Sequence, residues 1–575
     1  MSPKRLLHVC IRASATPFKP PASVPLSPRL VNHWTCARSQ VYNNVKHGYS
    51  TQTPAASYLV KLHRRSRGRP SSSSFWSFCA VAAGLVGAHL LAFQREVIAE
   101  APDKERELRF IRLDEVKKHG GTSERPWVIK GDCVYDITDW VGAHPGGEII
   151  LRAAGNRIEP YWDIFSMHKT QYVYDILEQY LVGKIHPEDL IDGHVPPTTV
   201  DDPFSNEPER DPRLHTLTAR PRCAETPSDS LAHFLTPNDT FYVRNHMWVP
   251  TVEEAEYRLT VELQDGEERS YSLQELKERF PRHKITATLQ CAGNRRKDMT
   301  EHARKTNGLQ WTVGAISTAE WEGVKLLDVL ADAGLDVKRP PPGAEHTHFV
   351  GHEAYGASIP IEKALDSRGD VLLAFNMNGK SLPPDHGFPL RVVVPGNVAA
   401  RSVKWLKKIV VSDEESPSQW QQKDYKCFGP NVANPDWSKG KSIQEMPVTS
   451  AITGIAIRED EERKCDVVEL KGYAFSGGGR EIVRVDISLD NGNTWDQAEL
   501  TLDEGKGSRA WCWKQWKYDG AEVPKGSATF LVKATDEAYN TQPETHSSIY
   551  NPRGNLATAW HRVAWESYVN TPRPE

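Results

Sequence analysis

The feature that most constrains the fold is a proline-rich, acidic run between His186 and His215, which divides the chain. The run has prolines at positions 187, 196, 197, 203, 208 and 212. Such a segment has few apolar side chains to bury, so we expect a linker rather than part of a core. Because 575 residues are also too many for one hydrophobic core, the chain is expected to form several domains.

Charge separates a further segment at the start of the chain. Residues 1–95 contain 13 Lys and Arg residues and no Asp or Glu, whereas the rest has 58 basic and 75 acidic residues, a formal charge of −17. Residues 1–74 are basic and rich in Ser and Thr, which is typical of a mitochondrial presequence. The alternative is a basic tail that binds nucleic acid. The apolar segment that follows favours targeting, so no nucleic-acid partner is expected.

This apolar segment, FWSFCAVAAGLVGAHLLAF (75–93), has no Asp, Glu, Lys or Arg and is flanked by arginines. Its length suffices for a marginal crossing of a bilayer. Two interpretations stay open: an anchor retained in the inner mitochondrial membrane, or a sorting signal that is cleaved to release the protein. Both predict a location in the mitochondrial intermembrane space.

The cysteines exclude several kinds of metal and redox site. Nine cysteines occur singly along the chain, and no two form a C-x-x-C pair. This spacing argues against a zinc ribbon, an iron–sulfur cluster, a thioredoxin motif and a covalently attached c-type haem. Each cysteine is therefore interpreted by itself, with a small buried side chain as the default.

A first candidate site lies in residues 105–186, where His144 begins an H-P-G-G turn and His168 follows 24 residues later. The turn lets one imidazole project into a pocket, and the second imidazole can close the opposite face. Two neutral imidazoles fill both axial positions of a haem iron, which suits electron transfer. The alternative is two ordinary surface histidines.

The residues around His144 favour the haem site. The segment CVYDITDWVGAHPGGEIILRAAG (133–155) resembles the cytochrome b5 family in its strand, its D-I-T-x-W helix start, its H-P-G-G loop and its A-A-G. The resemblance implies an α+β haem domain over 105–186 that binds haem b without covalent attachment. It also implies His144 and His168 as iron ligands, with secondary haem contacts from Thr170 and Tyr172.

A second candidate site lies at TATLQCAGNRRKDM (286–299). A strand is expected to end at Cys291, after which small residues and then Arg295 and Arg296 follow. A thiolate is a soft metal ligand, and neighbouring cations favour its deprotonation. The alternative is a buried cysteine beside two solvated arginines.

Three further segments supply cations and hydrogen-bond donors on short loops beside strands. They are FYVRNHMWVP (241–250), LPPDHGFPLRVVVPG (382–396) and ARSVKWLKKIV (400–410). Such donors suit a dianionic, phosphate-bearing cofactor. Together with CAGNRR, GAISTAEW and YGASIP, these segments resemble the eukaryotic sulfite oxidase family of molybdenum enzymes, from about residue 107 to residue 575.

The resemblance implies a multidomain α+β fold with a fixed order of domains. The cytochrome b5-like domain is followed by a hinge or linker at 187–206, which would let the haem domain move. An α+β molybdopterin domain at 207–426 and an immunoglobulin-like β-sandwich at 427–575, which mediates homodimer formation, complete the chain. The β-sandwich also agrees with VDISLDNGNTWDQAEL (485–500), where apolar residues alternate around an Asn-Gly turn, as in a hairpin.

The resemblance also assigns site residues. Cys291 corresponds to the single protein ligand of molybdenum, and Tyr425 corresponds to a tyrosine of the substrate pocket, which Trp311 is expected to line. The arginines that correspond to the family's anion-binding arginines are Arg244, Arg296 and Arg553. The residues that correspond to cofactor contacts are Tyr242, Val243, Arg244, Asn245, His246, Cys291, His386, Arg391, Ser402, Val403 and Lys404. The family also has an aspartate just ahead of Y-G-A-S-I-P, and VGHEAYGASIP shows no evident counterpart.

The reaction that the resemblance implies is oxidation of sulfite to sulfate at a molybdenum–molybdopterin centre, with electrons passed through haem b to cytochrome c. The acidic balance after residue 95 favours encounter with a basic partner. One alternative is a nitrate-reductase-like molybdoenzyme, although those enzymes place the haem domain after the molybdenum domain and add a flavin module. Another is a membrane-anchored electron carrier with a catalytically inactive C-terminal scaffold, which predicts lost ligands.

Overall fold

The computed structural model describes residues 108–144, 147–165, 168–197, 202–432, 434–462, 465–501, 509–522 and 529–564. The predicted presequence (1–74) and apolar segment (75–93) lie outside these ranges. Within the ranges, no helix combines the length and the apolar composition that a membrane crossing needs. Helices are interspersed among strands up to Gln422, and strands follow from Thr449 onward, so the expected multidomain α+β fold is confirmed.

The predicted haem domain is built on a five-stranded sheet in the order β1-β5-β3-β2-β4. Its side chains alternate between two cores, since Ile129 and Val134 pack on one face and Val128 and Tyr135 on the other, as the pleat of a strand requires. The expected helix start at D-I-T-x-W is a 3-10 turn, η1. The elements are β1 Arg109–Ile111, α2 Leu113–Lys118, β2 Trp127–Lys130, β3 Cys133–Asp136, η1 Thr138–Ala143, η2 Gly147–Ala153, β4 Asn156–Arg157, α3 Glu159–Ile164, α4 Gln171–Glu178 and β5 Leu181–Ile185.

The first part of the predicted linker packs onto the haem domain. Leu190 and Val195 contribute to the core on one face of its sheet. The backbone N–H of Leu113 also donates to the carboxylate of Asp189 at 2.8 Å. These contacts hold the linker as far as Val195, so the hinge at 187–206 stays a prediction for the residues that follow.

The predicted molybdopterin domain contains two larger sheets, one in the order β10-β9-β18-β13-β14 and one in the order β11-β12-β15-β16 with β17 paired to β15. A small sheet joins β6, β7 and β8. The strands are β6 His215–Thr218, β7 Cys223–Glu225, β8 Val243–Arg244, β9 Arg258–Glu262, β10 Glu268–Ser272, β11 His283–Gln290, β12 Ile316–Lys325, β13 His346–Gly351, β14 Gly356–Pro360, β15 Leu372–Met377, β16 Lys380–Ser381, β17 Arg391–Val393 and β18 Leu406–Ser412.

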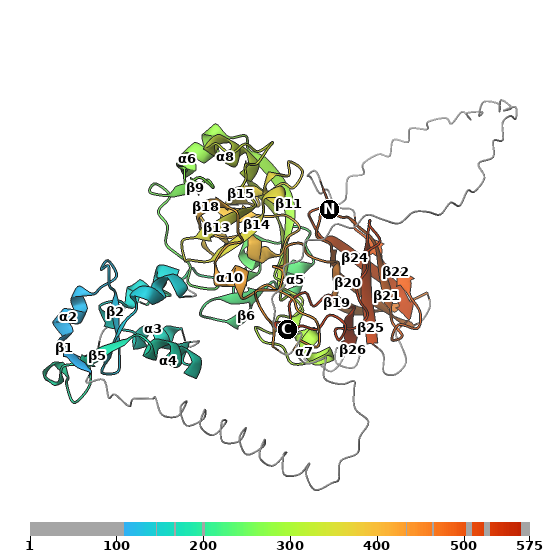
Figure 1. Ribbon diagram of the computed structural model, residues 1–575. Coiled ribbons are helices and arrows are strands. Elements are labelled where there is room, and N and C mark those ends of the chain that lie inside the picture. Colours follow the sequence, from blue (N-terminus) through green and yellow to red (C-terminus); the bar gives the residue numbers. More distant parts are fainter. Residues whose placement is uncertain are drawn as a thin grey trace, which may run out of the picture. The chain divides into compact units, whose positions relative to one another are not determined.

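The helices of this domain begin and end at local signals in the sequence. Helix α6 starts with a capping box, in which the Ser272 hydroxyl accepts from the Glu275 N–H at 3.1 Å and the Glu275 carboxylate accepts from the Ser272 N–H at 2.7 Å. Helix α8 ends at Gly334, whose φ of 116° suits only glycine. Both helices lie at one end of the domain (Figure 1). The helices are α5 Ser228–Leu231, α6 Leu273–Arg279, α7 Arg296–His302, α8 Leu326–Ala333, α9 Ile361–Leu365 and α10 Gln419–Gln422.

The C-terminal residues form two facing sheets (Figure 1), as expected for a β-sandwich, in the orders β19-β20-β24-β23 and β22-β21-β25-β26. The expected hairpin is present, since Ile487 pairs with Asp496, and both Asn491 and Gly492 have positive φ in its turn. The connection is longer than a two-residue turn, and within it the side chain of Asp490 accepts from the Thr494 N–H at 2.9 Å. The strands are β19 Thr449–Asp460, β20 Cys465–Phe475, β21 Ile482–Ser488, β22 Asp496–Gln497, β23 Glu499–Leu500, β24 Lys514–Glu522, β25 Thr529–Asp536 and β26 His561–Ala564.

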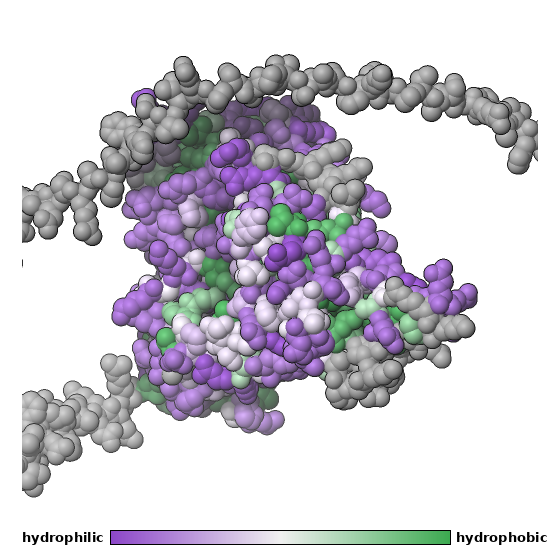
Figure 2. Space-filling model, turned by 90° about the vertical axis from the view of Figure 1, so that its right-hand side faces the viewer, coloured by the Kyte–Doolittle hydropathy of each residue, from purple (hydrophilic) through white to green (hydrophobic). Residues whose placement is uncertain are grey.

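The β-sandwich and the molybdopterin domain share a buried core. Tyr473 and Trp513 of the β-sandwich belong to the same apolar cluster as Phe349 and Leu406. The hydroxyl of Tyr473 donates to the carbonyl of Val313 at 2.9 Å. The face seen in Figure 2 is mainly hydrophilic and carries only small apolar patches, so the apolar side chains of this face lie mostly in the cores.

Candidate active site

The lone thiol of Cys291 is fixed by the end of strand β11. This strand pairs with β12 up to Gln290, and the Cys291 N–H still donates to the Ala315 carbonyl at 3.0 Å. The chain then reverses, because the Asn294 N–H donates to the Cys291 carbonyl at 3.0 Å and Arg295 adopts a left-handed φ of 62°. Helix α7 begins at the next residue. The strand end predicted from the sequence is therefore confirmed.

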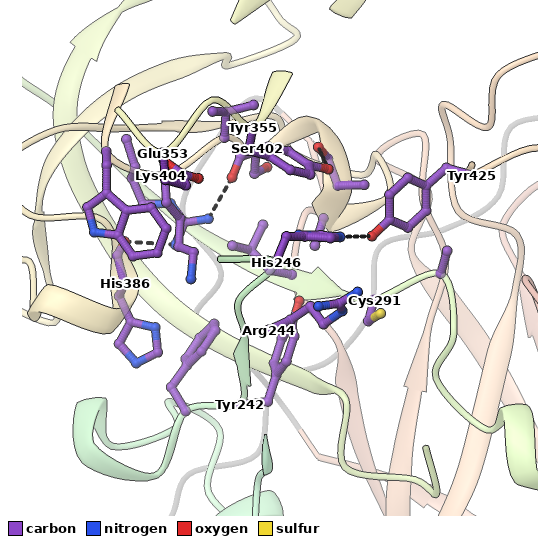
Figure 3. Close-up of a pocket in the computed structure, with 18 residues that line it drawn as sticks. Tyr242, Arg244, His246, Cys291, Glu353, Tyr355, His386, Ser402, Lys404 and Tyr425 are labelled. Atoms are coloured by element: carbon purple, nitrogen blue, oxygen red, sulfur yellow. Dashed lines mark hydrogen bonds between the residues drawn. The ribbon is translucent and has the colours of Figure 1, made fainter. Parts of the chain in front are cut away.

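Cys291 opens onto a pocket that is lined by charged, polar and aromatic side chains. Its walls come from β8, the end of β11, and the loops before and after β17 and β18 (Figure 3). The sequence-predicted residues that line it are Tyr242, Arg244, His246, Cys291, His386, Arg391, Ser402, Val403, Lys404 and Tyr425.

Electrostatics at the thiol combine burial with positive charge. Burial raises the pKa of Cys291, while the charges of Arg244 and Arg296 act in the opposite direction. The backbone N–H of Gly293 donates to the sulfur at 3.4 Å. The guanidinium of Arg244 lies beside Cys291 (Figure 3) and also donates to the sulfur of Cys223 at 3.5 Å. The sulfur thus has donors and cations around it, as a thiolate requires.

The cations of the pocket are held by backbone carbonyls. Arg391 donates to the carbonyls of His386 and Ser402, each at 3.0 Å. Lys404 donates to the carbonyl of Asp385 at 2.7 Å and to the side chain of Asn245. Burial lowers the pKa of Lys404 and lowers the pKa of Arg391 to about 10. Burial also lowers the pKa of His386 to about 3, so this ring is neutral.

Asp385 connects these cations to the residues that follow the linker. Arg210 donates to both carboxylate oxygens of Asp385, from Nε at 2.6 Å and from Nη2 at 2.9 Å. The amide of Asn245 donates to the same carboxylate at 2.9 Å. Both partners of the ion pair are almost fully buried, with side-chain exposures of 8% and 9%. The sequence did not predict this forked pair, because 175 residues separate its members.

Glu353 is a pocket residue that the sequence interpretation missed. It is 4% exposed, and its Oε2 atom has no hydrogen-bond partner among the described residues. Burial raises its pKa, and the charge of Lys404 opposes this shift. The side chain lies on the same side of the pocket as Lys404 and Ser402 (Figure 3). An acidic residue two positions before Tyr355 in VGHEAYGASIP was the available signal.

Tyr425 reaches the pocket from a left-handed turn, with a φ of 44°. Its hydroxyl shares a hydrogen bond of 2.9 Å with Nε2 of His246, the dashed contact in Figure 3. His246 stacks on Tyr355 with ring centroids 4.6 Å apart. Burial raises the pKa of Tyr425 and lowers the pKa of His246 well below its usual value. Both groups are therefore neutral near pH 7 and are joined by one hydrogen bond.

Arg296 and Arg553 lie beside the pocket rather than in its wall. Arg296 donates to the Arg553 carbonyl at 2.8 Å, the Leu309 carbonyl at 2.8 Å and the Asn555 side chain at 3.2 Å. The charge of Arg296 acts on Cys291, so the two are close. Of the remaining predicted site residues, Trp311 is 1% exposed in the same core cluster as Cys291, and Val243 and Asn245 are buried behind the wall.

The two predicted haem ligands lie close to each other in the haem domain, with their ring planes nearly parallel. The imidazole centroids of His144 and His168 are 6.1 Å apart, and the ring planes are inclined by only 17°. An iron between two imidazole nitrogens, each at a metal–nitrogen bond length of about 2 Å, needs a centroid separation of this size. Nδ1 of His168 contacts the Phe165 carbonyl at 2.9 Å, which leaves Nε2 for a metal. Tyr172 is 72% exposed, so its haem contact and that of Thr170 remain predictions.

The donor set fits the cofactor that the sequence implies. A soft thiol, buried cations and a neutral imidazole suit a metal bound to an anionic, phosphate-bearing group. The unpaired Glu353 oxygen suits the N–H groups of a pterin ring.

Comparisons with known proteins agree with this arrangement. Residues 112–186 match the family described as cytochrome b5-like heme/steroid binding domain. Residues 246–420 match the oxidoreductase molybdopterin binding domain, and residues 440–567 match the Mo-co oxidoreductase dimerisation domain.

Individual relatives cover most of the chain. The sulfite oxidase of Gallus gallus is 48% identical over 79% of this chain and 99% of that protein. The mitochondrial sulfite oxidase of Homo sapiens is 43% identical over 86% of this chain and 90% of that protein. Among solved structures, the sulfane dehydrogenase SoxCD from Paracoccus pantotrophus is 26% identical with a TM-score of 0.51, over 64% of this chain and 92% of that chain.

Proposed function

The chain belongs to the sulfite oxidase family of molybdenum enzymes, and from this premise we propose how its own residues oxidise sulfite to sulfate. The observation that carries the proposal is the meeting of Cys291, Arg244 and Tyr425 at one buried pocket. The bound molybdenum–molybdopterin group supplies the two-electron oxidation, and haem b supplies the one-electron transfer.

Cys291 is the protein ligand of the metal. The hydrogen bonds at the end of β11 hold its sulfur in place, and Arg244 and Arg296 favour the thiolate against the effect of burial. Coordination by a metal ion completes the deprotonation of a thiol. Cys291 is therefore a ligand and not a nucleophile, since no general base contacts it among the described residues.

Arg391, Lys404 and His386 hold the anionic side of the cofactor from one wall of the pocket. Two of them are cations fixed by backbone carbonyls, so they offer donors in set directions without further ordering. Glu353 takes the role of the aspartate that the sequence lacks ahead of Tyr355. Its unpaired oxygen can accept from the N–H groups of the pterin.

Arg244, Arg296 and Arg553 bind the substrate anion. Guanidinium groups offer forked donors that match the oxygens of sulfite and sulfate. Tyr425 is held by His246 at the edge of the pocket, where its hydroxyl can orient an anion oxygen. Arg553 belongs to the β-sandwich part of the chain, so the two domains contribute to one substrate site.

His144 and His168 would hold the haem, which would supply the one-electron transfer, and cytochrome c is the proposed acceptor. The acidic balance of the chain after residue 95 supports a basic acceptor. The chain forms a homodimer through its dimerisation domain. Its relatives carry mitochondrial names, and the basic start of the sequence supports the intermembrane space as the compartment.

The experiment is an anaerobic absorption spectrum of the metal-loaded protein before and after sulfite, with nitrate as the control. Prompt reduction of the haem by sulfite, and not by nitrate, is the expected result. It would establish the substrate and the internal electron path together. If the haem stays oxidised although molybdenum is bound, the pocket serves another oxyanion and the proposal fails.

A further inference from the structure

Arg553, which we propose as a substrate-binding residue, is already paired with a carboxylate. Its Nη2 donates to one oxygen of Asp424 at 2.8 Å, and its Nε donates to the other at 3.1 Å. The two residues are 129 positions apart in the chain. A forked pair of this kind fixes the orientation of a guanidinium and offsets its charge.

Asp424 also supports the turn that carries Tyr425 into the pocket. Its Oδ1 atom accepts from the backbone N–H of Tyr425 at 2.8 Å, at the point where Tyr425 takes its left-handed φ. The side chain of Asp424 is 15% exposed and that of Arg553 is 34% exposed. The carboxylate therefore lies beside the pocket, in contact with Arg553 and next in sequence to Tyr425, which lines the pocket.

The charge of Asp424 reaches the walls of the pocket. After burial, this charge is one of the contributions to the pKa of Arg244, Tyr355 and Tyr425, and it raises each of them. The other acid of the pocket, Glu353, has a raised pKa because of burial, so it offsets less positive charge. Asp424 is thus a negative charge that would repel an anion bound at Arg553.

We propose that Asp424 competes with the bound anion for Arg553 and so weakens retention of the sulfate product. Sulfate leaves as a dianion, and a neighbouring negative charge destabilises a dianion strongly in a partly buried site. The pair also fixes the position of the guanidinium beside the pocket. This inference rests on the proposed role of Arg553 in binding the substrate anion.

The rival explanation is that the pair is only a structural latch between the two segments. The two explanations predict opposite changes in the affinity for the anion when the pair is lost. Loss of a latch would free Arg553 to move and weaken anion binding, whereas loss of a competing charge strengthens it. Asp424→Asn separates them, because the amide keeps an oxygen for the Tyr425 N–H and removes the charge. Asp424→Glu keeps the charge, and Asp436→Asn removes a charge from an exposed ion pair with Lys439 in the same segment.

The test measures binding of inorganic sulfate by calorimetry, together with sulfate inhibition of sulfite oxidation. Asp424→Asn is expected to bind sulfate about tenfold more tightly, the factor that about 1.4 kcal/mol represents, and to show product inhibition at lower sulfate. Asp424→Glu and Asp436→Asn are expected to match the parent protein.

Unchanged or weaker sulfate binding by Asp424→Asn would overturn the inference. Equally tight binding by Asp424→Glu would also overturn it. Absence of measurable sulfate binding by both the parent protein and Asp424→Asn would overturn it as well. The calorimetric arm does not need turnover. It therefore distinguishes failure of this inference from failure of the proposed sulfite oxidation.

Discussion

Replacing Arg296 by glutamine tests whether this residue is both a charge for the substrate and a tie between the domains. Its guanidinium donates three hydrogen bonds, to Arg553, Leu309 and Asn555. Two glycines close tightly around it, since a Cβ built on Gly293 would lie 2.5 Å from its Nη2 and one on Gly554 would lie 2.6 Å from its Cγ. The side chain therefore has one position.

The size of the effect follows from these contacts. Glutamine is shorter and can keep one of the three bonds at best. Each lost charge-assisted bond is worth about 1.5–3 kcal/mol, so two lost bonds cost roughly 3–6 kcal/mol. Burial lowers the pKa of Arg296, which means that burial destabilises the charged form of this side chain. Removing the charge recovers part of the loss, and the expected net decrease in the free energy of unfolding is about 2–3 kcal/mol.

The assay is urea unfolding of the whole chain, which has 17 tryptophans, followed by tryptophan fluorescence, with haem absorbance as an internal reference. The Michaelis constant for sulfite is measured on the same samples. Lys297→Gln is the matched control, because Lys297 is 50% exposed and its ion pair with Glu301 spans 3.8 Å. It should change stability by less than about 0.5 kcal/mol.

Arg296 also positions Arg553 through the carbonyl of that residue, so their effects on sulfite binding should not add. The double variant Arg296→Gln/Arg553→Gln is expected to raise the Michaelis constant by less than the product of the single effects. Strict additivity, or a stability loss no larger than that of Lys297→Gln, would refute the reasoning.

Three further predictions concern the metal ligand, the buried ion pair and the effect of pH. Cys291→Ser should keep haem and dimer but lose sulfite oxidation, and near-normal turnover would reject the ligand role. Arg210→Gln leaves the buried carboxylate of Asp385 without its paired guanidinium, so the molybdopterin content per haem should fall at least about tenfold. Arg213→Gln, a change at an exposed arginine, is the control. Equal molybdopterin content in both variants would contradict the expectation. Burial lowers the pKa of His561 to about 4, below the unfolded value of about 6.5, so its contribution to stability is full above pH 6.5 and is lost as the pH falls toward 4. His561→Asn, which can still accept from the Ile452 N–H, should therefore reduce the loss of stability between pH 7 and pH 5 by up to about 2 kcal/mol, and an unchanged pH profile would exclude His561 as its source.

The parts of the fold that the sequence predicted correctly have local causes. The end of β11 at Cys291 and the positive φ at Asn491 and Gly492 each depend on residues within one short segment. His144 and His168 are only 24 residues apart and both belong to the haem domain. Local propensity and turn chemistry are sufficient signals in such cases.

The parts that the sequence did not predict depend on pairs far apart in the chain. Arg210 meets Asp385, and Arg553 meets Asp424, across 175 and 129 residues. An isolated charged residue in a loop looks the same in sequence whether it is solvated or buried. Only the packing of the folded chain brings these charges together, and the same packing buries the unpaired oxygen of Glu353.

The positive charges of the pocket explain why Asp385 lies behind the pocket wall while Glu353 lines the pocket. Burial lowers the pKa of Arg391, Arg401 and Lys404, so the fold alone holds these cations at a cost. Asp385 offsets part of that cost from behind the wall, where Arg210 and Asn245 keep its carboxylate away from the cavity. An acid inside the cavity would instead neutralise the cations before an anionic cofactor could. Burial raises the pKa of Glu353, the acid that does line the cavity, which limits this competition. The remaining positive charge is available to the cofactor and substrate, and their binding is then also a source of stability for the folded chain.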